Sequence, residues 1–506
     1  MGSLSTEAGC QAIREAWNCT SLEKAESFLT TQGSSAPLEL ENFVSNKFNP
    51  STQHLDAINP KTGKVFARVP VSSAQEVDEA VKNATDAFKS WSKTTVAVRS
   101  KYLQKIAQLI QENHELFAVW ESLDQGKTLA RARVEVDRAI SNFNYFSTFI
   151  LHQETAARMI DGVALTYEHR SPAGVFALIS PWNMPLYLLT WKIAPCLAFG
   201  CTAVAKPSEV TSMSAFLLCE VFRQSGLPSG VMNVVFGDGP TTGSALVRSP
   251  LVKGVSFTGG TATGIQIRKD TADQIYKHLS LELGGKNPTL VFDDVDLTKA
   301  VETAAMAAFE NQGEICLCGS RIYVQSSIYD RFVSTFTSYV QDNYKRGGRM
   351  GAVVSLPHYR KIRSYLELAA SEEAQFVIGE IPAADPQDGL WIDPVILTGV
   401  STSSRVMREE IFGPVVTIAK FETEEEAVEL ANDNPNGLAA VLLTKDGARI
   451  RRVGEQIEAG LVWVNCWLVR ELGTPFGGMK NSGTGREGGE YSRDVFTVVR
   501  TLHIPM

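Results

Sequence analysis

The sequence predicts an α/β fold of two Rossmann-type domains with parallel sheets, plus a β arm for oligomerisation. From about residue 174, two series of short strands, each apolar throughout, alternate with longer helical stretches. Such strands, separated by helices, indicate a parallel sheet that is covered on both faces. The stretch 154–172 alternates without a helical pattern, and an exposed arm of this kind usually pairs with another strand, which we expect in a second subunit.

The first series predicts one sheet, with helices at 186–199, 211–224 and 261–275. Ligands of parallel sheets bind beyond the carboxyl ends of the strands, so loops such as PWNM and KPSE are candidate binding loops. The strands are expected at GVFALIS (174–180), TAVAKP (202–207), VMNVVF (231–236), GVSFTG (254–259) and PTLVFDD (288–294).

The second series predicts another sheet, and the two domains meet near Leu283-Gly284-Gly285. A chain of 506 residues is too long for one simple core, so several packed units agree with its length. The strands are expected at RIYVQS (321–326), PVILTG (394–399), VVTIAKF (415–421), AAVLLTK (439–445) and LVWVNC (461–466). The helices are expected at 329–343, 360–371, 424–433 and 447–458.

Composition and charge argue against several classes of function. The net charge of −8 and the pI near 5.6 do not favour nucleic acid or an anionic membrane as the main partner. No run of about 18 apolar residues is present, and the first ~35 residues lack a signal-peptide core, so we expect a cytoplasmic protein. The eight cysteines form neither a CxxC pair nor a cluster with histidine, which predicts reduced thiols and no metal site.

The glycine pattern leaves nucleotide binding open. The nearest match to G-x-G-x-x-G is Gly237-Asp238-Gly239 followed by Gly243, which is one residue too long. Gly259-Gly260 with Gly264 follows a strand and opens a helix, but its spacing also differs. Backbone N–H groups at this helix start can hold a pyrophosphate, or the glycines are simple turn residues.

A set of motifs spread along the chain supplies further support for nucleotide binding. In order, they are ISPWNMP (179–185), AKPSE (205–209), FTG (257–259), LELGGKNP (281–288), NQGEIC (311–316), EEIFGP (409–414) and PFGGMKNSGTGRE (475–487). Together they resemble the aldehyde dehydrogenase superfamily, from Glu41 to the C-terminus. The resemblance implies NAD-dependent oxidation of an aldehyde to a carboxylic acid by a homodimer or homotetramer. It also implies an N-terminal extension (1–37), an NAD-binding domain (38–153 and 173–283), a catalytic domain (284–475) and an oligomerisation arm (154–172 and 488–506).

Three residues match the family's catalytic positions. Cys316 in NQGEIC is the expected nucleophile, because a thiol forms a thioester that remains reactive enough to hydrolyse. Glu282 in LELGGK is the expected general base for the hydrolytic water, which would make the enzyme hydrolytic and non-acylating. Asn183 is expected to donate to the oxyanion, together with the backbone N–H of Cys316. Taken alone, the same residues can be a core thiol, a surface carboxylate and a helix cap.

The resemblance also implies the cofactor site. Lys206 and Glu209 match residues that contact the adenosine ribose, and a carboxylate there repels a 2′-phosphate, which favours NAD over NADP. A surface ion pair is the alternative for these two residues. The chain departs from the family at Gly260, where serine is frequent, so one hydroxyl contact to the pyrophosphate is expected to be missing. The other expected cofactor residues are Ser180, Trp182, Gly239, Gly259, Glu410 and Phe412.

The expected substrate rests on two arginines. CWLVRELGTPFGG (466–478) and DRAISNF (137–143) resemble the 2-aminomuconic (2-hydroxymuconic) semialdehyde dehydrogenase branch. In that branch, arginines matching Arg138 and Arg470 bind the carboxylate of the substrate, a role that suits the planar guanidinium. The alternative is structural: ion pairs of Arg138 with Asp137 or Glu135, and of Arg470 with Glu471.

Other functions remain open at this point. The loop at residues 347–352 is about six residues shorter than the branch pattern implies, and the N-terminal segment is longer. A broad-specificity aldehyde dehydrogenase, an enzyme of a secondary-metabolite pathway and a non-catalytic protein of the same fold are therefore the alternatives.

Overall fold

The computed structural model describes residues 10–25, 27 and 37–506. Much of the expected N-terminal extension (1–37) lies outside these residues. Its described part includes helix α1 (Gln11–Trp17), in which Ile13 and Ala16 are fully buried in a hydrophobic core. The indole Nε1 of Trp120 donates to the carbonyl of Ala16 at 3.0 Å, so α1 belongs to the folded body.

The first large sheet has the strand order β22-β12-β11-β8-β9-β10-β2-β3. Strands β12 to β10 in this order run parallel, and every residue of β8 and β9 is buried, as their continuously apolar sequences predicted. Strand β12 is not among the strand-like runs expected from the sequence. The bounds are β2 (Asn42–Val44), β3 (Lys47–Asn49), β8 (Val175–Ile179), β9 (Thr202–Lys206), β10 (Met232–Val234), β11 (Val252–Thr258), β12 (His278–Glu282) and β22 (Gly483–Thr484).

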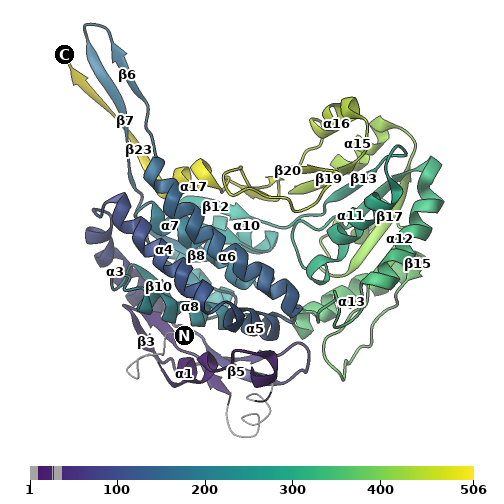
Figure 1. The fold of residues 1–506 in the computed structure, drawn as a ribbon, viewed down its shortest axis with the longest axis horizontal. Helices are drawn as coiled ribbons and strands as arrows, with labels where there is room; N and C mark the ends of the chain where they lie inside the picture. The colour runs from purple at the N-terminus through teal and green to yellow at the C-terminus, as the bar shows by residue number, and fades with distance from the viewer. Residues whose placement is uncertain (1–9, 26, 28–36) are drawn as a thin grey trace.

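Helices cover both faces of this sheet (Figure 1). One core joins the sheet to the helices α4 to α8, and another joins its opposite face to α3, α9 and α10. The helices from α3 to α6 were not predicted. The bounds are α3 (Ala74–Trp91), α4 (Val96–Glu112), α5 (His114–Gln125), α6 (Leu129–Phe149), α7 (Pro185–Ala198), α8 (Met213–Gln224), α9 (Ser244–Arg248) and α10 (Thr261–Asp270).

The second large sheet has the order β15-β16-β17-β14-β13-β19-β20, with only its edge strand β15 antiparallel. The sequence reading grouped PTLVFDD with the first series, and this was wrong: it forms β13, near the centre of the second sheet. The strands are β13 (Pro288–Val291), β14 (Arg321–Gln325), β15 (Gln375–Ile378), β16 (Val395–Thr398), β17 (Val415–Phe421), β19 (Ala439–Leu443) and β20 (Leu461–Val464). The helices are α11 (Leu297–Phe309), α12 (Tyr329–Asn343), α13 (Leu356–Ser371), α14 (Arg405–Arg408), α15 (Glu424–Asn432) and α16 (Gly447–Gly454).

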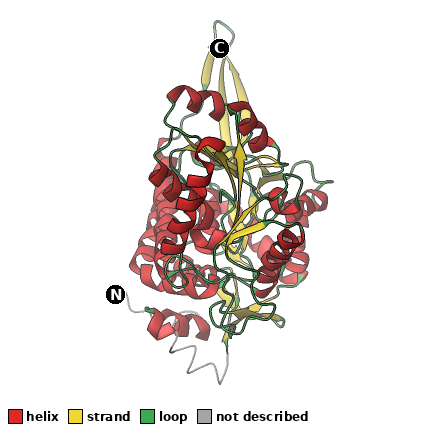
Figure 2. Ribbon diagram, turned by 90° about the vertical axis from the view of Figure 1, so that its right-hand side faces the viewer, coloured by secondary structure: helices red, strands yellow, loops and turns green. Residues whose placement is uncertain are grey.

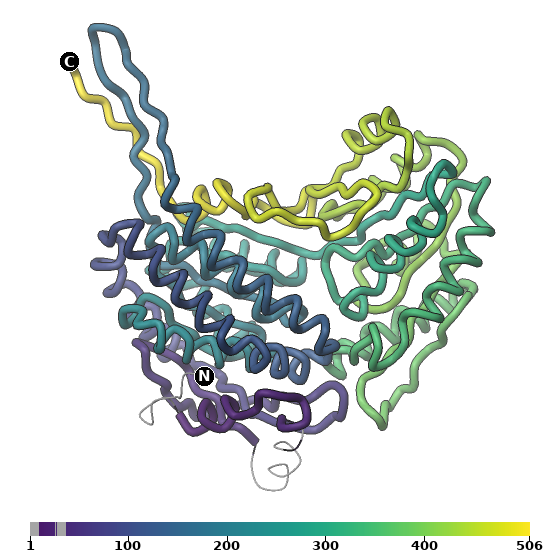
Figure 3. The backbone as a smooth tube through the Cα atoms, in the orientation of Figure 1, coloured from purple at the N-terminus to yellow at the C-terminus, as the bar shows by residue number. Residues whose placement is uncertain are grey.

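A long arm projects from the body and carries the C-terminus (Figures 1 and 3). It is a three-stranded antiparallel sheet of β6 (Ala157–Ile160), β7 (Ala164–Pro172) and β23 (Thr497–Pro505), in the order β23-β7-β6. Seen from the side, its strands extend well beyond the helices (Figure 2). Apolar side chains are exposed on it, including Met159, Val498 and Ile504.

The remaining elements are short. Helix α17 (Gly489–Phe496) leads into β23, and its Phe496 is buried in the core that joins the first large sheet to helices α4 to α8. A small sheet holds β1 (Leu38–Glu39), β5 (Val65–Pro70) and β4 (His54–Ile58), and β18 (Asn436–Gly437) pairs with β21 (Met479–Lys480). Among the described helices, none has the length and apolar character that crossing a membrane requires.

Candidate active site

One pocket brings together residues that lie far apart in the sequence. It has a volume of about 230 Å³ and contains Trp182, Asn183, Gly259, Gly260, Cys316, Glu410 and Phe412 of the predicted site. Pro181, Thr258, Leu283, Gly284, His358 and Lys361 complete its wall. A larger cavity of about 750 Å³ lies at α12 and residues 378–394, and it contains none of the predicted site residues.

Cys316 follows an unusual stretch of backbone. Asn311, Gln312 and Gly313 have φ values of 52°, 56° and 71°, which only glycine adopts without strain. The side-chain amide of Asn287 donates to the carbonyl of Cys316 at 2.7 Å and holds the loop in place. Burial raises the pKa of the Cys316 thiol above its ordinary value, and the carboxylates of Glu410 and Glu282 raise it further. The half-buried thiol is therefore neutral in this environment, and it needs a base to become a nucleophile.

Asn183 is buried directly before helix α7, and its side-chain amide faces the loop that carries Cys316. Its Nδ2 donates to the carbonyl of Glu314 at 2.8 Å, which leaves the second N–H of the amide available. Its Oδ1 has no hydrogen-bond partner among the residues that the structure describes. The residue does not cap α7, because the N-cap position is Met184 and no side-chain cap bond is present.

Glu282 ends strand β12 and is buried beside a group of charges. Both of its carboxylate oxygens lack a hydrogen-bond partner within the described part of the chain. Burial raises the pKa of Glu282 well above its ordinary value, and the charge of Glu487 adds to this, while Lys192, Arg470 and Arg486 oppose it. A carboxyl group with a raised pKa can accept a proton near neutral pH, as a general base must.

The Glu487 carboxylate belongs to a buried polar group that the sequence reading missed. Lys192 Nζ lies 3.4 Å from Glu487 Oε1 and 3.0 Å from the Ser256 hydroxyl. The Ser256 and Ser280 hydroxyls donate to the same carboxylate oxygen at 2.9 and 3.3 Å. The lysine lies within the apolar stretch of α7, where a cation needs a buried partner, and that was the available signal.

Glu410 and Phe412 line the same pocket as Cys316. The backbone N–H of Gly285 donates to Glu410 Oε1 at 2.9 Å, which fixes the carboxylate at the junction of the two sheets. Phe412 has a φ of 63°, and its ring lies edge-on to Trp182 at 5.2 Å between centroids. His358, another residue not predicted, contacts the carbonyl of Phe412 at 2.6 Å, and burial lowers its pKa to about 4. The histidine is therefore neutral at physiological pH.

The other predicted cofactor residues lie outside the pocket, at the ends of strands β8 and β9. Lys206 Nζ donates to the carbonyl of Pro207 at 3.1 Å and lies 3.5 Å from the half-exposed Glu209 carboxylate. The Ser180 hydroxyl is buried and has no partner among the described residues. Gly260 precedes α10 without a side-chain cap, and the space where its Cβ would be is open, as it is at Gly239. Gly239 begins the short turn 239–243 and does not reach the pocket.

Arg138 and Arg470 converge on Tyr187, another residue not predicted. The Arg470 guanidinium donates to the Tyr187 hydroxyl at 2.9 Å, and that of Arg138 lies 5.0 Å from the centre of the Tyr187 ring. The structure contradicts the ion-pair alternative: Glu135 pairs with Lys127 and Arg131, and Asp137 with His114. Within the described residues, neither Arg138 nor Arg470 has an ion pair with a carboxylate, and Nε and Nη2 of Arg470 are buried without a hydrogen-bond partner. The Arg470 guanidinium packs between the rings of Trp191 and Phe476, at 4.1 and 3.9 Å from their centres.

Comparison with known proteins shows the family of the chain. The aldehyde dehydrogenase family model matches residues 48–502. This chain belongs to the aldehyde dehydrogenase family. It is 45% identical to the 2-aminomuconic semialdehyde dehydrogenase of Homo sapiens, over 93% of this chain and 99% of that protein. It is 40% identical to the 2-hydroxymuconic semialdehyde dehydrogenase of Pseudomonas sp. (strain CF600), over 92% and 100%.

The fold of this aldehyde dehydrogenase is also that of solved structures. Betaine aldehyde dehydrogenase from Staphylococcus aureus in complex with NAD+ superimposes with a TM-score of 0.88 at 35% identity, covering 92% of this chain and 94% of that one. In the described part of the chain, no group of three or more His, Cys, Asp or Glu side chains is placed to hold a metal ion.

Proposed function

We propose that this chain oxidises an aldehyde to a carboxylic acid with NAD+, through a thioester on Cys316. The observation that carries the proposal is the single pocket that joins Cys316 and Asn183 to Glu410, Phe412 and Gly260. A nucleophile, an oxyanion donor and a candidate cofactor wall thus meet within one small volume.

Residues at three places in the structure suit the parts of an NAD molecule. The uncapped N-terminus of α10 presents backbone N–H groups that suit a pyrophosphate. Lys206, Glu209 and the unpartnered Ser180 hydroxyl suit the hydroxyls of the adenosine ribose, and the Glu209 carboxylate disfavours a 2′-phosphate. Glu410 suits the second ribose. When bound, NAD+ supplies the hydride acceptor and a positive charge near the thiol.

In the first half-reaction, the Cys316 thiol loses its proton to solvent, and Sγ attacks the aldehyde carbon. The oxyanion accepts hydrogen bonds from Asn183 Nδ2 and the backbone N–H of Cys316, and one such donor is worth about 2.7–4 kcal/mol. The hydride then leaves the same carbon, which converts the thiohemiacetal into a thioester. In the second half-reaction, Glu282 takes a proton from water, and the hydroxide adds to the thioester carbonyl. The C–S bond then breaks, the carboxylic acid departs, and the Cys316 thiolate takes back the proton from Glu282.

The proposed substrate carries a carboxylate. Two arginines share Tyr187 without a carboxylate partner in the described structure, and such a pair suits a planar anion. The charge of Arg470 acts on Glu282, so this anion site lies near the proposed base. The relatives named for 2-aminomuconic and 2-hydroxymuconic semialdehydes support the same class, an acidic semialdehyde.

Two variants test the covalent route. We expect Cys316→Ser to retain NAD+ binding, measured by quenching of protein fluorescence, and to lose NADH formation, measured by absorbance. We expect Glu282→Ala to accumulate an acyl adduct on Cys316, visible as an increase in the mass of the intact protein. Full activity of Cys316→Ser would show that Cys316 is not the nucleophile. A Glu282→Ala protein that turns over without an adduct would show that Glu282 is not the general base.

A further inference from the structure

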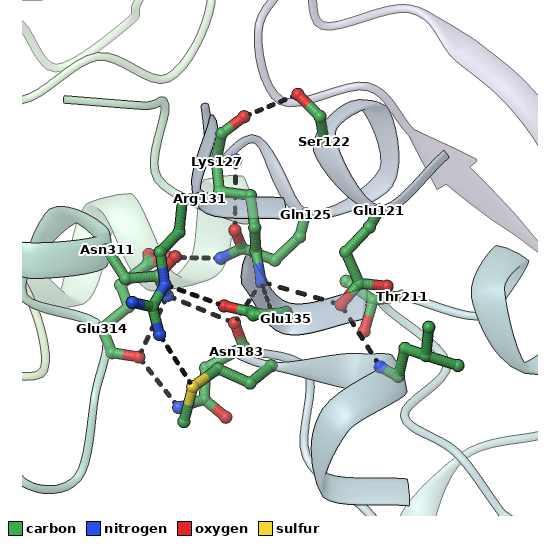
Figure 4. A network of polar contacts seen from close by, with 12 residues as sticks. Glu121, Ser122, Gln125, Lys127, Arg131, Glu135, Asn183, Thr211, Asn311 and Glu314 are labelled. Atoms are coloured by element: carbon green, nitrogen blue, oxygen red, sulfur yellow. Dashed lines mark hydrogen bonds and ion pairs between the residues drawn. The ribbon is translucent and has the colours of Figure 1, made fainter. Parts of the chain in front are cut away.

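Next to Asn183 lies a buried group of charges centred on Lys127, in the connection between α5 and α6 (Figure 4). The Lys127 side chain is fully buried. Its ammonium contacts the Glu135 carboxylate, lies 3.7 Å from Glu121 Oε1 and donates to the main-chain carbonyl of Asn183 at 3.0 Å. Lysine is almost never buried without partners, so this arrangement needs an explanation.

The carboxylates explain how the charge is tolerated. Arg131 adds a second cation, whose Nε donates to Glu135 Oε1 at 3.1 Å, so two cations and two carboxylates are buried together. Such a group is weak evidence for stability, since apolar side chains of the same volume often serve as well. What apolar side chains cannot supply is the hydrogen bond from Lys127 to the carbonyl of Asn183.

The same group holds the chain on both sides of Asn183. The carbonyl of Asn183 also accepts from Asn311 Nδ2 at 3.2 Å, and Asn311 belongs to the strained stretch before Cys316. Two residues beyond Met184, the backbone N–H of Leu186 donates to Glu121 Oε1 at 3.2 Å. The backbone of Asn183 is therefore tied to the α5–α6 connection and to the loop of the nucleophile at once.

We propose that Lys127 is a positioning residue for the oxidation, because its ammonium holds the Asn183 carbonyl and thereby aims the Asn183 amide at the oxyanion. This inference rests on the oxyanion role proposed above for Asn183. A displacement of about 1 Å in such a donor costs about 100-fold in rate, so a fixed backbone at this residue matters for turnover.

The test compares Lys127→Met with a matched control, Arg131→Met. Both variants remove a buried cation from Glu135, but only the first removes the hydrogen bond to Asn183. We expect Lys127→Met to lower kcat about 10- to 100-fold, since loss of an oxyanion donor itself costs about 100- to 1,000-fold. We expect its Kd for NAD+ to change less than about twofold, and Arg131→Met to keep kcat within about twofold on a neutral aldehyde.

A double-mutant cycle separates positioning from general damage. In the Asn183→Ala background, Lys127→Met should lower kcat by less than about threefold, because the amide that it aims is already absent. Full multiplication of the two losses, or an unchanged kcat in Lys127→Met, would overturn the positioning role. An unchanged kcat in Asn183→Ala alone would instead remove the oxyanion role. If Lys127→Met does not fold, the same comparison is made with Lys127→Met/Glu135→Gln, which removes cation and carboxylate together.

Discussion

At the scale of single residues, the anion site has a sharp consequence for substrate choice. Arg470→Met removes the guanidinium that contacts Tyr187, while Tyr187→Phe keeps both arginines and removes only one hydrogen bond. We expect Arg470→Met to lower kcat/KM for 2-hydroxymuconic semialdehyde at least about 100-fold, as loss of a charged partner costs several kcal/mol. The loss for benzaldehyde should be below about fivefold, and Tyr187→Phe should be milder on both. Equal losses on the two substrates would exclude a carboxylate clamp.

The pH dependence of turnover follows from the surroundings of Glu282. A general base works as a carboxylate, so the rate should rise as pH increases through the raised pKa of Glu282. Glu487→Gln removes a negative charge that raises this pKa, so the acid limb of the kcat profile should move to lower pH.

The matched control is Glu487→Asp, which keeps the charge and should leave the acid limb close to its original position. A profile of Glu487→Gln that moves to higher pH, or does not move, would show that another group controls the limb. The measurement is kcat between about pH 5 and 9 with saturating substrates.

The sequence could predict those residues that lie in a local motif typical of the family. Cys316 and Asn183 stand in such motifs, and the structure places both in one pocket. Tyr187 and Lys127 could not be found in this way, because a tyrosine in an apolar helix and a lysine in a loop are ordinary alone. Their positions become informative only when α6, α7 and the loop of Arg470 pack together.

At the scale of elements, the strained turn before Cys316 depends on Gly313. A Cβ at this residue would lie 2.2 Å from the carbonyl of Gly413, and its φ of 71° disfavours any other side chain. We expect Gly313→Ala to lower the free energy of unfolding by about 1–3 kcal/mol and to reduce kcat, because the loop that carries Cys316 must shift. Thermal unfolding and steady-state kinetics measure the two effects.

Gly447→Ala in helix α16 is the control for this prediction. Apart from its chain neighbours and the backbone of its own helix, no described atom lies within 4 Å of the place where its Cβ would be, and alanine favours a helix by about 1 kcal/mol. The control should therefore be neutral or slightly stabilising. A Gly313→Ala protein with the stability and kcat of the parent would contradict the role given to this turn.

Periodicity predicted the fully buried parallel strands well and a partly exposed one poorly. Strands β8 and β9 are buried over their whole length, so their apolar runs carry a clear signal. Strand β12 reads HLSLE, and its first residue is exposed, which weakens the same signal. The order of strands depends on contacts between distant segments, and this is why β13 was assigned to the wrong sheet.

At the scale of the whole molecule, β6 and β23 are the outer strands of the arm, each with an edge unpaired within the described residues, and the arm exposes apolar side chains. Such an edge usually pairs with another strand, so we propose that the arm joins subunits into a homodimer or homotetramer. We expect Val499→Asp with Ile504→Asp to shift the mass in light scattering toward the monomer. Arg500→Ala on the same strand is the control and should keep the assembly. An unchanged mass in the double variant would remove the arm from the interface.

The long-range pairing of the last residues has a consequence for biosynthesis. Strand β23 pairs with β7, β22 pairs with β12, and Glu487 lies in the core beside Ser256 and Ser280. The first sheet therefore cannot be completed until residues 483–484 have left the ribosome, nor the arm until residues 497–505 have done so. Until then, the growing polypeptide exposes strand edges and apolar surface, the features that make nascent chains aggregate and bind chaperones. A ribosome that stops before residue 483 would leave the first large sheet without β22, and one that stops before residue 497 would leave the arm without β23.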